Sequence, residues 1–134
     1  MSIGARQSPD AYTIIAKKSL IGTKVINTAR EDLGSIDDLA IDASTGRVAY
    51  AILSFGGWLG MGNKYFAIPW EALNFNPSEK AVVLSVEKER LKNAPGFDKD
   101  DWPNMSDRAW GSQLYSYYGY RPYWENEGIP RTSR

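Results

Sequence analysis

Three aspartates placed close together, Asp37, Asp38 and Asp42, are the first residues whose types and spacing could support chemistry. Two neighbouring carboxylates can share acid–base catalysis, and three can hold a hard cation such as Ca²⁺. A backbone explanation competes with both, because aspartates in bulges and turns accept hydrogen bonds from nearby N–H groups. We favour the backbone explanation, in which Arg47 could pair with one of these carboxylates across a hairpin.

A second group of carboxylates comes from Asp98, Asp100 and Asp101. A calcium-binding loop of the EF-hand type needs a glycine at its sixth position and a glutamate at its end, and this segment has neither. These aspartates are therefore expected to be solvated residues of a turn or of a helix start. We expect no metal site and no catalytic residue in the chain.

The segment GGWLGMGNK at residues 56–64 places four glycines ahead of a lysine, which raises the question of a phosphate-binding loop. A Walker-type loop needs lysine directly after its last glycine, where this chain has Asn63, followed by Ser or Thr and a helix. The dinucleotide-binding pattern also fails, because Tyr65 occupies its third glycine position. A glycine-rich hairpin loop with positive φ angles explains the segment better, so we expect no cofactor.

The composition of the 134-residue chain limits the classes of function. Lys and Arg together number 16, as do Asp and Glu, so no net positive charge attracts nucleic acid or anionic lipid. The chain has no cysteine and no histidine, which excludes disulfides, thiolate metal sites and any Ser–His or Cys–His pair. The N-terminal stretch has no long apolar run, so we expect a cytoplasmic protein without a membrane span. We expect that it is not an enzyme.

Short apolar segments separated by glycine-containing turns predict the scaffold that must position these residues. The alternation within 36–42 breaks near Asp37 and Asp38, which is typical of a β-bulge. The segment 47–55 is apolar on both parities and predicts a strand covered on both faces. About six strands favour an all-β fold, a small antiparallel barrel with short helical turns. The expected strands include 19–26, 36–42, 47–55, 64–69 and 81–86. The expected helical segments are 70–73, 88–94 and 107–118, and 74–80 is expected to be a turn.

The C-terminal segment is rich in aromatic residues. Of the 17 aromatic residues in the chain, 8 lie within the 23 residues from Trp102 to Trp124. Tyr and Trp offer large contact areas with a polar tip, which suits either a cover over the chain's own barrel or an interface with a partner. The sequence leaves both alternatives open. The expected helix at 107–118 has Asp107 as its N-cap and Gly119 as its stop.

A series of short motifs stands in a recognisable order and spacing: LGSIDDL (33–39), ID (41–42), TGRVAYAILS (45–54), GG (56–57), LG (59–60), AIPWEAL (67–73), APGF (94–97) and DWP (101–103). Together these motifs resemble the PRC-barrel family over about 19–103. The family includes the cytoplasmic domain of the photosynthetic reaction-centre H subunit and the C-terminal domain of a 16S rRNA processing factor. We expect this chain to lack the transmembrane helix of the first and the preceding barrel of the second, so stand-alone bacterial members resemble it most.

The resemblance implies an antiparallel β-barrel and a docking role, and it transfers no catalytic residue. We therefore expect a flexible N-terminal arm at 1–18, a PRC-type barrel at 19–97 and an aromatic-rich, partly helical extension at 98–134. The expected function is a non-catalytic protein-binding or adaptor module that self-associates, with a homodimer as the commonest symmetric outcome. The alternatives are a small-molecule or enzymatic pocket between barrel and extension, and association with the ribosome or RNA processing.

The residues expected to bind a partner are apolar or aromatic and lie at the tip of the glycine loop or in the extension. Apolar residues at a loop tip usually fold back onto the core, but they can also anchor a partner. The candidates are Trp58, Leu59, Met61, Trp110, Tyr115, Tyr117, Tyr118, Tyr120, Tyr123 and Trp124.

Overall fold

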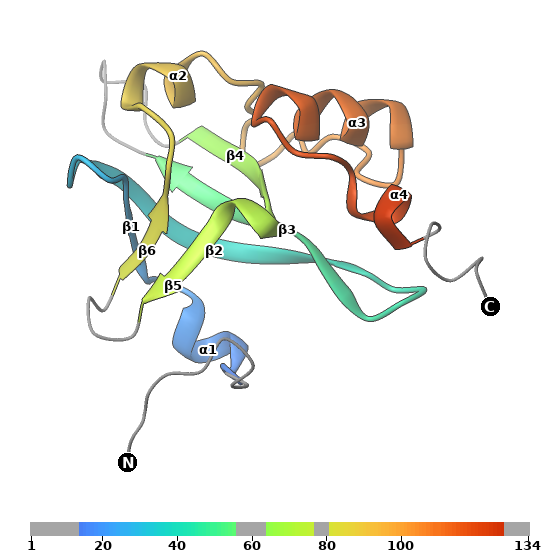
Figure 1. Ribbon diagram of the computed structural model, residues 1–134, viewed down its shortest axis with the longest axis horizontal. Coiled ribbons are helices and arrows are strands. Elements are labelled where there is room, and N and C mark those ends of the chain that lie inside the picture. The colour runs from blue at the N-terminus through green and yellow to red at the C-terminus, as the bar shows by residue number, and fades with distance from the viewer. Residues whose placement is uncertain (1–13, 56–63, 77–80, 128–134) are drawn as a thin grey trace.

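Six strands and several short helices make up the residues that the computed structural model describes, 14–55, 64–76 and 81–127 (Figure 1). The strands are β1 (Lys24–Ile26), β2 (Asp32–Asp42), β3 (Arg47–Phe55), β4 (Lys64–Pro69), β5 (Leu73–Asn76) and β6 (Ala81–Leu84). The helical segments are α1 (Lys17–Leu20), the 3₁₀ turn η2 (Trp70–Ala72), α2 (Lys88–Lys92), α3 (Arg108–Tyr117) and α4 (Tyr123–Glu127). No helix within these described ranges is both long and apolar enough to cross a membrane.

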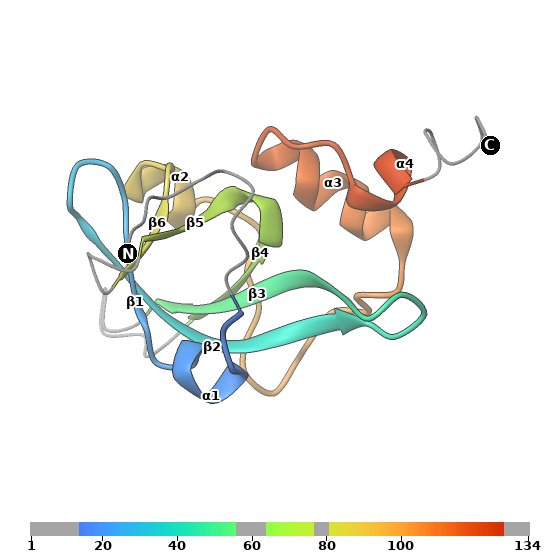
Figure 2. The same ribbon diagram turned by 60° about the horizontal axis from the view of Figure 1, so that its bottom comes forward.

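The six strands form one mixed sheet in the order β4-β3-β2-β1-β6-β5. Four neighbouring pairs are antiparallel, whereas β1 and β6 run parallel. The two edge strands, β4 and β5, follow each other in sequence because η2 turns the chain between them. The sheet curls into a half-barrel (Figure 2), which confirms the predicted PRC-type β fold and adds one parallel pair to its expected antiparallel pairing.

The long hairpin of β2 and β3 forms the centre of the sheet and carries much of the candidate site. Gly46, at a φ of +79°, closes its turn by donating its N–H to the Asp42 carbonyl at 2.7 Å. The register of the pair shifts at 36–38, as the broken alternation predicts, and again at 40–41. Residues 49–55 of β3 are all buried, which confirms that both faces of this strand are covered.

Two local predictions are wrong. Ser19 and Leu20 belong to the single helical turn α1 rather than to a first strand. This turn places Leu20 in a buried position, and Gly22, at a φ of +89°, redirects the chain before β1. The segment after η2 is the strand β5 rather than a turn, because Phe75 pairs with Val82 of β6. In both cases a tertiary contact decides the conformation of a short segment with weak local preference.

The other helical boundaries agree with the sequence. Pro69 ends β4, and η2 begins at Trp70. α3 begins after Asp107, whose side chain accepts the N–H of Ala109 at 2.9 Å, and it ends shortly before Gly119, which has a φ of +83°. These capping residues therefore determine where the tail helix starts and stops.

The C-terminal helices and α1 lie on opposite sides of the sheet. Figures 1 and 2 place α3 and α4 above β3 and β4, and α1 on the far side of β2. Leu114 and Tyr115 of α3 are buried in the same core as Tyr50 of β3 and Phe66 of β4. The C-terminal segment is therefore packed as part of the folded unit.

Candidate functional site

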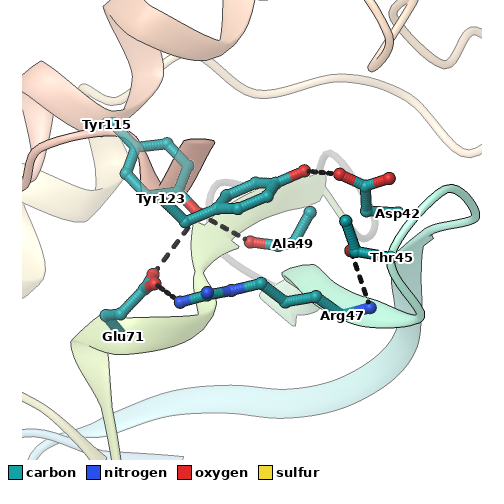
Figure 3. Close-up of polar contacts among 7 residues, drawn as sticks. All are labelled: Asp42, Thr45, Arg47, Ala49, Glu71, Tyr115 and Tyr123. Atoms are coloured by element: carbon teal, nitrogen blue, oxygen red, sulfur yellow. Dashed lines mark hydrogen bonds and ion pairs between the residues drawn. The ribbon is translucent and has the colours of Figure 1, made fainter. Parts of the chain in front are cut away.

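A group of polar and aromatic side chains ties the C-terminal helices to the β2–β3 hairpin and to η2. We call it the anchor cluster, and it consists of Asp42, Thr45, Arg47, Ala49, Glu71, Tyr115 and Tyr123 (Figure 3). The Tyr115 hydroxyl donates to the Ala49 carbonyl at 3.0 Å and lies 3.4 Å from Glu71 Oε1. The Tyr123 hydroxyl donates to Asp42 Oδ2. Tyrosine hydroxyls therefore join elements that lie far apart in the sequence.

Arg47 links the two sides of the anchor cluster. Its Nη2 donates to Glu71 Oε2 at 2.6 Å, and its guanidinium carbon lies 4.9 Å from the centre of the Tyr123 ring. The side chains of Arg47 and Glu71 keep 35% and 30% of their surface exposed, so solvent screens part of their attraction. The sequence allows an aspartate as the partner of Arg47, whereas in the structure η2 brings Glu71 to it.

The protonation states in the anchor cluster follow from burial and hydrogen bonding. Burial, reinforced by the charge of Glu71, raises the pKa of Tyr115, so its hydroxyl stays a donor at physiological pH. Hydrogen bonds from Ser44 and then from Tyr123 lower the pKa of Asp42, so its carboxylate stays ionised. Both shifts move the pKa of the group further from neutral pH, whereas a general acid or base would need a pKa near neutral. The cluster is therefore suited to holding the tail in place.

A cavity of about 320 Å³ lies beside the anchor cluster, between the hairpin and the C-terminal helices, and we call it the tail cavity. It combines charged, hydroxyl-bearing and aromatic side chains. Its lining residues are Ala40, Ile41, Asp42, Ala43, Ser44, Ala49, Tyr50, Met105, Ser106, Arg108, Tyr123 and Trp124. Asp42 and Tyr123 belong to both the tail cavity and the anchor cluster, so the position of α4 shapes the cavity.

A second hollow, of about 610 Å³, lies where α1, β2, β3, η2 and β5 meet, and we call it the apolar groove. Its lining residues are Ile14, Ile15, Lys17, Leu20, Leu39, Val48, Trp70, Glu71, Leu73 and Phe75. The rings of Trp70 and Phe75 pack with centres 4.9 Å apart, and both side chains are half-buried. Glu71 lines this groove and also belongs to the anchor cluster.

Most tail aromatics expected to bind a partner lie against the chain's own barrel. Tyr115, Tyr118 and Tyr123 are buried, Trp110, Tyr117 and Trp124 are half-buried, and Tyr120 is 38% exposed. The ring of Tyr50 makes edge-to-face contacts with Trp110 and Tyr115, at centre distances of 5.4 and 5.6 Å. The loop-tip candidates Trp58, Leu59 and Met61 fall outside the described residues. These contacts favour the covering role for the buried tyrosines, and partner binding by this set stays a prediction.

Two of the three aspartates considered first, Asp38 and Asp42, accept hydrogen bonds from the nearby backbone. Asp42 accepts both the N–H of Ser44 at 3.0 Å and its hydroxyl at 2.6 Å, which is the expected turn-capping role. Asp38 accepts the N–H of Leu39 at 2.8 Å and lies 3.4 Å from Lys17 Nζ. Within the part of the chain that the structure describes, no three His, Cys, Asp or Glu side chains are grouped so that they could hold a metal ion.

Sequence reasoning did not identify Tyr50 or Arg108 as site residues. Tyr50 carries a hydroxyl within the apolar run 48–53. This hydroxyl could have marked Tyr50 as a site residue, because buried hydroxyls need hydrogen-bond partners. Arg108 offers no comparable signal, because its approach to the hairpin results from the docking of α3.

Comparison with known proteins identifies the class. The chain belongs to the PRC-barrel domain family, whose sequence model matches residues 13–91. One similar solved structure is a putative 16S ribosomal RNA processing protein, RimM, from Pseudomonas aeruginosa, with 19% sequence identity and a TM-score of 0.38. The match covers 65% of this chain and 50% of that protein. A search of curated proteins found no match.

Proposed function

We propose that this chain is a non-catalytic protein-binding module built on a PRC-barrel, and that the apolar groove is its docking surface. The observation that carries the proposal is the set of apolar side chains left open where α1, η2 and β5 meet. Contiguous exposed apolar surface on a soluble protein commonly marks an interaction site. The proposed partner contributes an apolar segment that removes this surface from water.

The apolar groove combines open aliphatic residues with aromatic anchors. Ile14 is 94% exposed and Ile15 is 44% exposed, so both can gain burial when a partner docks. Trp70 and Phe75 offer half-buried rings held together by their mutual packing. Interfaces concentrate binding energy in such partly pre-organised aromatic residues near their centre.

Charged residues at the groove support a protein interface rather than an uninterrupted apolar core. Lys17 and Glu71 both line the groove, and each already has a partner, Asp38 and Arg47 respectively. A polar rim around an apolar centre is typical of protein interfaces. These charges would set the orientation of the partner, while the apolar residues would supply most of the affinity.

The non-catalytic part of the proposal rests on the residue types. The sequence contains no histidine or cysteine, and the tyrosines of the anchor cluster are used to hold the tail. The pKa of the Asp42 carboxyl group there is lowered rather than raised toward neutrality. A general base that works near neutral pH needs the opposite shift.

A second copy of the chain is the first occupant to test. Symmetric dimers bury the same patch on both subunits, so one exposed groove suffices for self-association. We expect the mass of the full chain to rise with concentration in sedimentation velocity. Ile15→Asp places a charge in the groove and should return the protein to monomer, with a stability change within about 0.5 kcal/mol because the residue is partly exposed.

Tyr120→Ser is the matched control, because Tyr120 is an exposed aromatic of the tail outside the groove. It should associate like the unchanged chain. Loss of self-association in Tyr120→Ser but not in Ile15→Asp would assign docking to the tail and contradict the proposal that the groove is the docking surface.

If the unchanged chain stays monomeric, a capture experiment replaces sedimentation. The immobilised full chain and its Ile15→Asp variant should then capture different proteins from native lysate. Identical captures by the two would refute the groove as a docking surface.

A further inference from the structure

The tail cavity has the size and the mixed lining of a small-molecule site, independent of any docking at the apolar groove. Its volume of about 320 Å³ is at the lower end of the range typical of ligand pockets, roughly 300–1,000 Å³. Ile41, Met105 and Trp124 offer apolar surface, and Asp42 and Arg108 offer opposite charges. Such a lining suits a small ligand that is partly apolar and partly charged.

Tyr50 supplies a buried hydroxyl that no described residue satisfies. Tyr50 lines the cavity, is only 2% exposed, and its hydroxyl has no hydrogen-bond partner among the described residues. Burial raises the pKa of Tyr50 to about 12, so the hydroxyl remains protonated and able to donate. Buried hydroxyls in folded proteins are nearly always hydrogen-bonded. This hydroxyl has almost no accessible surface and lies packed beneath Gly111 of α3, so its desolvation is uncompensated by the described residues.

The space around this hydroxyl depends on a glycine. A Cβ built on Gly111 of α3 would lie 2.6 Å from Tyr50 Oη and 2.8 Å from Trp124 Cη2. Both separations are shorter than a van der Waals contact, so a side chain at Gly111 would displace the hydroxyl or the indole. The glycine keeps the Tyr50 hydroxyl and the Trp124 ring in place at the cavity.

The two charged groups of the cavity are not paired with each other. The Asp42 carboxylate accepts hydrogen bonds from Ser44. It also accepts one from the Tyr123 hydroxyl (Figure 3). The Arg108 guanidinium lies 5.1 Å from the centre of the Trp124 ring and makes no ion pair with any described residue. A carboxylate held by hydrogen bonds and a guanidinium without an ion pair among the described residues therefore line the same cavity.

We propose that the tail cavity binds a small zwitterion of the α-amino-acid type. The ligand's carboxylate pairs with the Arg108 guanidinium, whose planar N–H groups match carboxylate geometry. Its ammonium group lies toward the Asp42 carboxylate. A simple anion fits less well because Asp42 would repel it, and a simple cation fits less well because Arg108 would.

Isothermal titration calorimetry on the full chain with three compounds of similar shape tests the charge requirement. L-leucine carries both charges, isocaproate lacks the ammonium and isoamylamine lacks the carboxylate. We expect leucine to bind and each single-charge analogue to bind at least about tenfold more weakly, because each leaves one charged group of the cavity unpaired. Absence of leucine binding at millimolar concentration, or equal binding of leucine and isocaproate, would overturn the proposal.

Matched variants test the residues. Arg108→Gln should weaken leucine binding by roughly tenfold to a hundredfold, because a hydrogen bond to a charged group is lost. Arg121→Gln removes an exposed arginine of the same tail that does not line the cavity, and it should bind like the unchanged chain. Equal affinities of Arg108→Gln and Arg121→Gln would refute the assigned role of Arg108.

Discussion

The apolar groove and the tail cavity lie on two sides of the anchor cluster, and they differ in how the sequence builds them. The groove contains open aliphatic and aromatic side chains from α1, η2 and the sheet. The cavity contains charged and hydroxyl groups that meet only because α3 and α4 pack on the hairpin. Glu71 of the cluster lines the groove, and Asp42 and Tyr123 of the cluster line the cavity.

This difference separates two kinds of dependence on the C-terminal segment. The groove is lined entirely by residues between Ile14 and Phe75, and Glu71, which bonds to Tyr115, connects it to the tail. The cavity takes Met105, Arg108 and Trp124 from the tail itself. Loosening the tail should therefore abolish the cavity while leaving most of the groove intact.

The largest effect is expected from Tyr115→Ala. Tyr115 is fully buried, contacts the Tyr50 ring and donates to the Ala49 carbonyl. Large-to-small substitutions of buried aromatic residues cost about 3–5 kcal/mol, so the free energy of unfolding should fall by that amount. Chemical denaturation measures the loss.

Tyr115→Phe is the matched variant for this prediction. It keeps the ring and removes only the hydroxyl, so its cost should be about 1 kcal/mol, as for one hydrogen bond. If Tyr115→Ala and Tyr115→Phe destabilise the protein equally, ring packing of the tail against β3 contributes little, and the tail is not the cover described above.

A smaller effect is expected from Gly111→Ala. Alanine favours a helix over glycine by about 1 kcal/mol, but the new Cβ would press on the Tyr50 hydroxyl and the Trp124 ring. Overpacking costs about 1–3 kcal/mol, so we expect a net loss of stability together with loss of leucine binding. Gln113→Ala, at an exposed position of the same helix, should not destabilise the protein. A more stable Gly111→Ala would show that the helix can move away from the sheet without cost.

Acid should weaken the attachment of the tail to the hairpin at Asp42. The pKa of Asp42 is lowered in the folded protein, first by Ser44 and then by Tyr123. Its contribution to stability is therefore complete above the unfolded-state pKa of about 3.9 and is lost as the pH falls through the lower folded-state value. Asp42→Asn should thus melt below the unchanged chain near neutral pH, and the gap between the two melting temperatures should close in acid. A gap that stays constant with pH would contradict this assignment.

The sequence is sufficient for those parts of the fold where one residue dictates local geometry. The broken alternation at Asp37 and Asp38 predicts a bulge, and a register shift lies there. Asp107 and Gly119 predict the ends of α3 because an N-cap and a positive φ are local requirements. Pro69 ends β4 because it cannot donate a backbone hydrogen bond.

The rest depends on contacts that no local pattern contains. β5 looks like a polar turn in the sequence, and it is a strand because β6 supplies its hydrogen bonds. The parallel pairing of β1 with β6 joins segments more than fifty residues apart. The meeting of Arg47 with Glu71, and of Asp42 with Tyr123, likewise requires the complete half-barrel and the docked tail.

The smallest effect is expected from Tyr50→Phe, and its sign tests whether the Tyr50 hydroxyl has a structural partner. A hydroxyl that serves packing would have a partner, and its removal would cost about 1 kcal/mol. The Tyr50 hydroxyl has no partner among the described residues, so its desolvation is uncompensated in the ligand-free protein. Tyr50→Phe should therefore leave the free energy of unfolding unchanged or raise it slightly, by up to about 1 kcal/mol. Thermal unfolding without leucine measures this change in stability. A clear loss of stability would mean that the hydroxyl already has a structural partner.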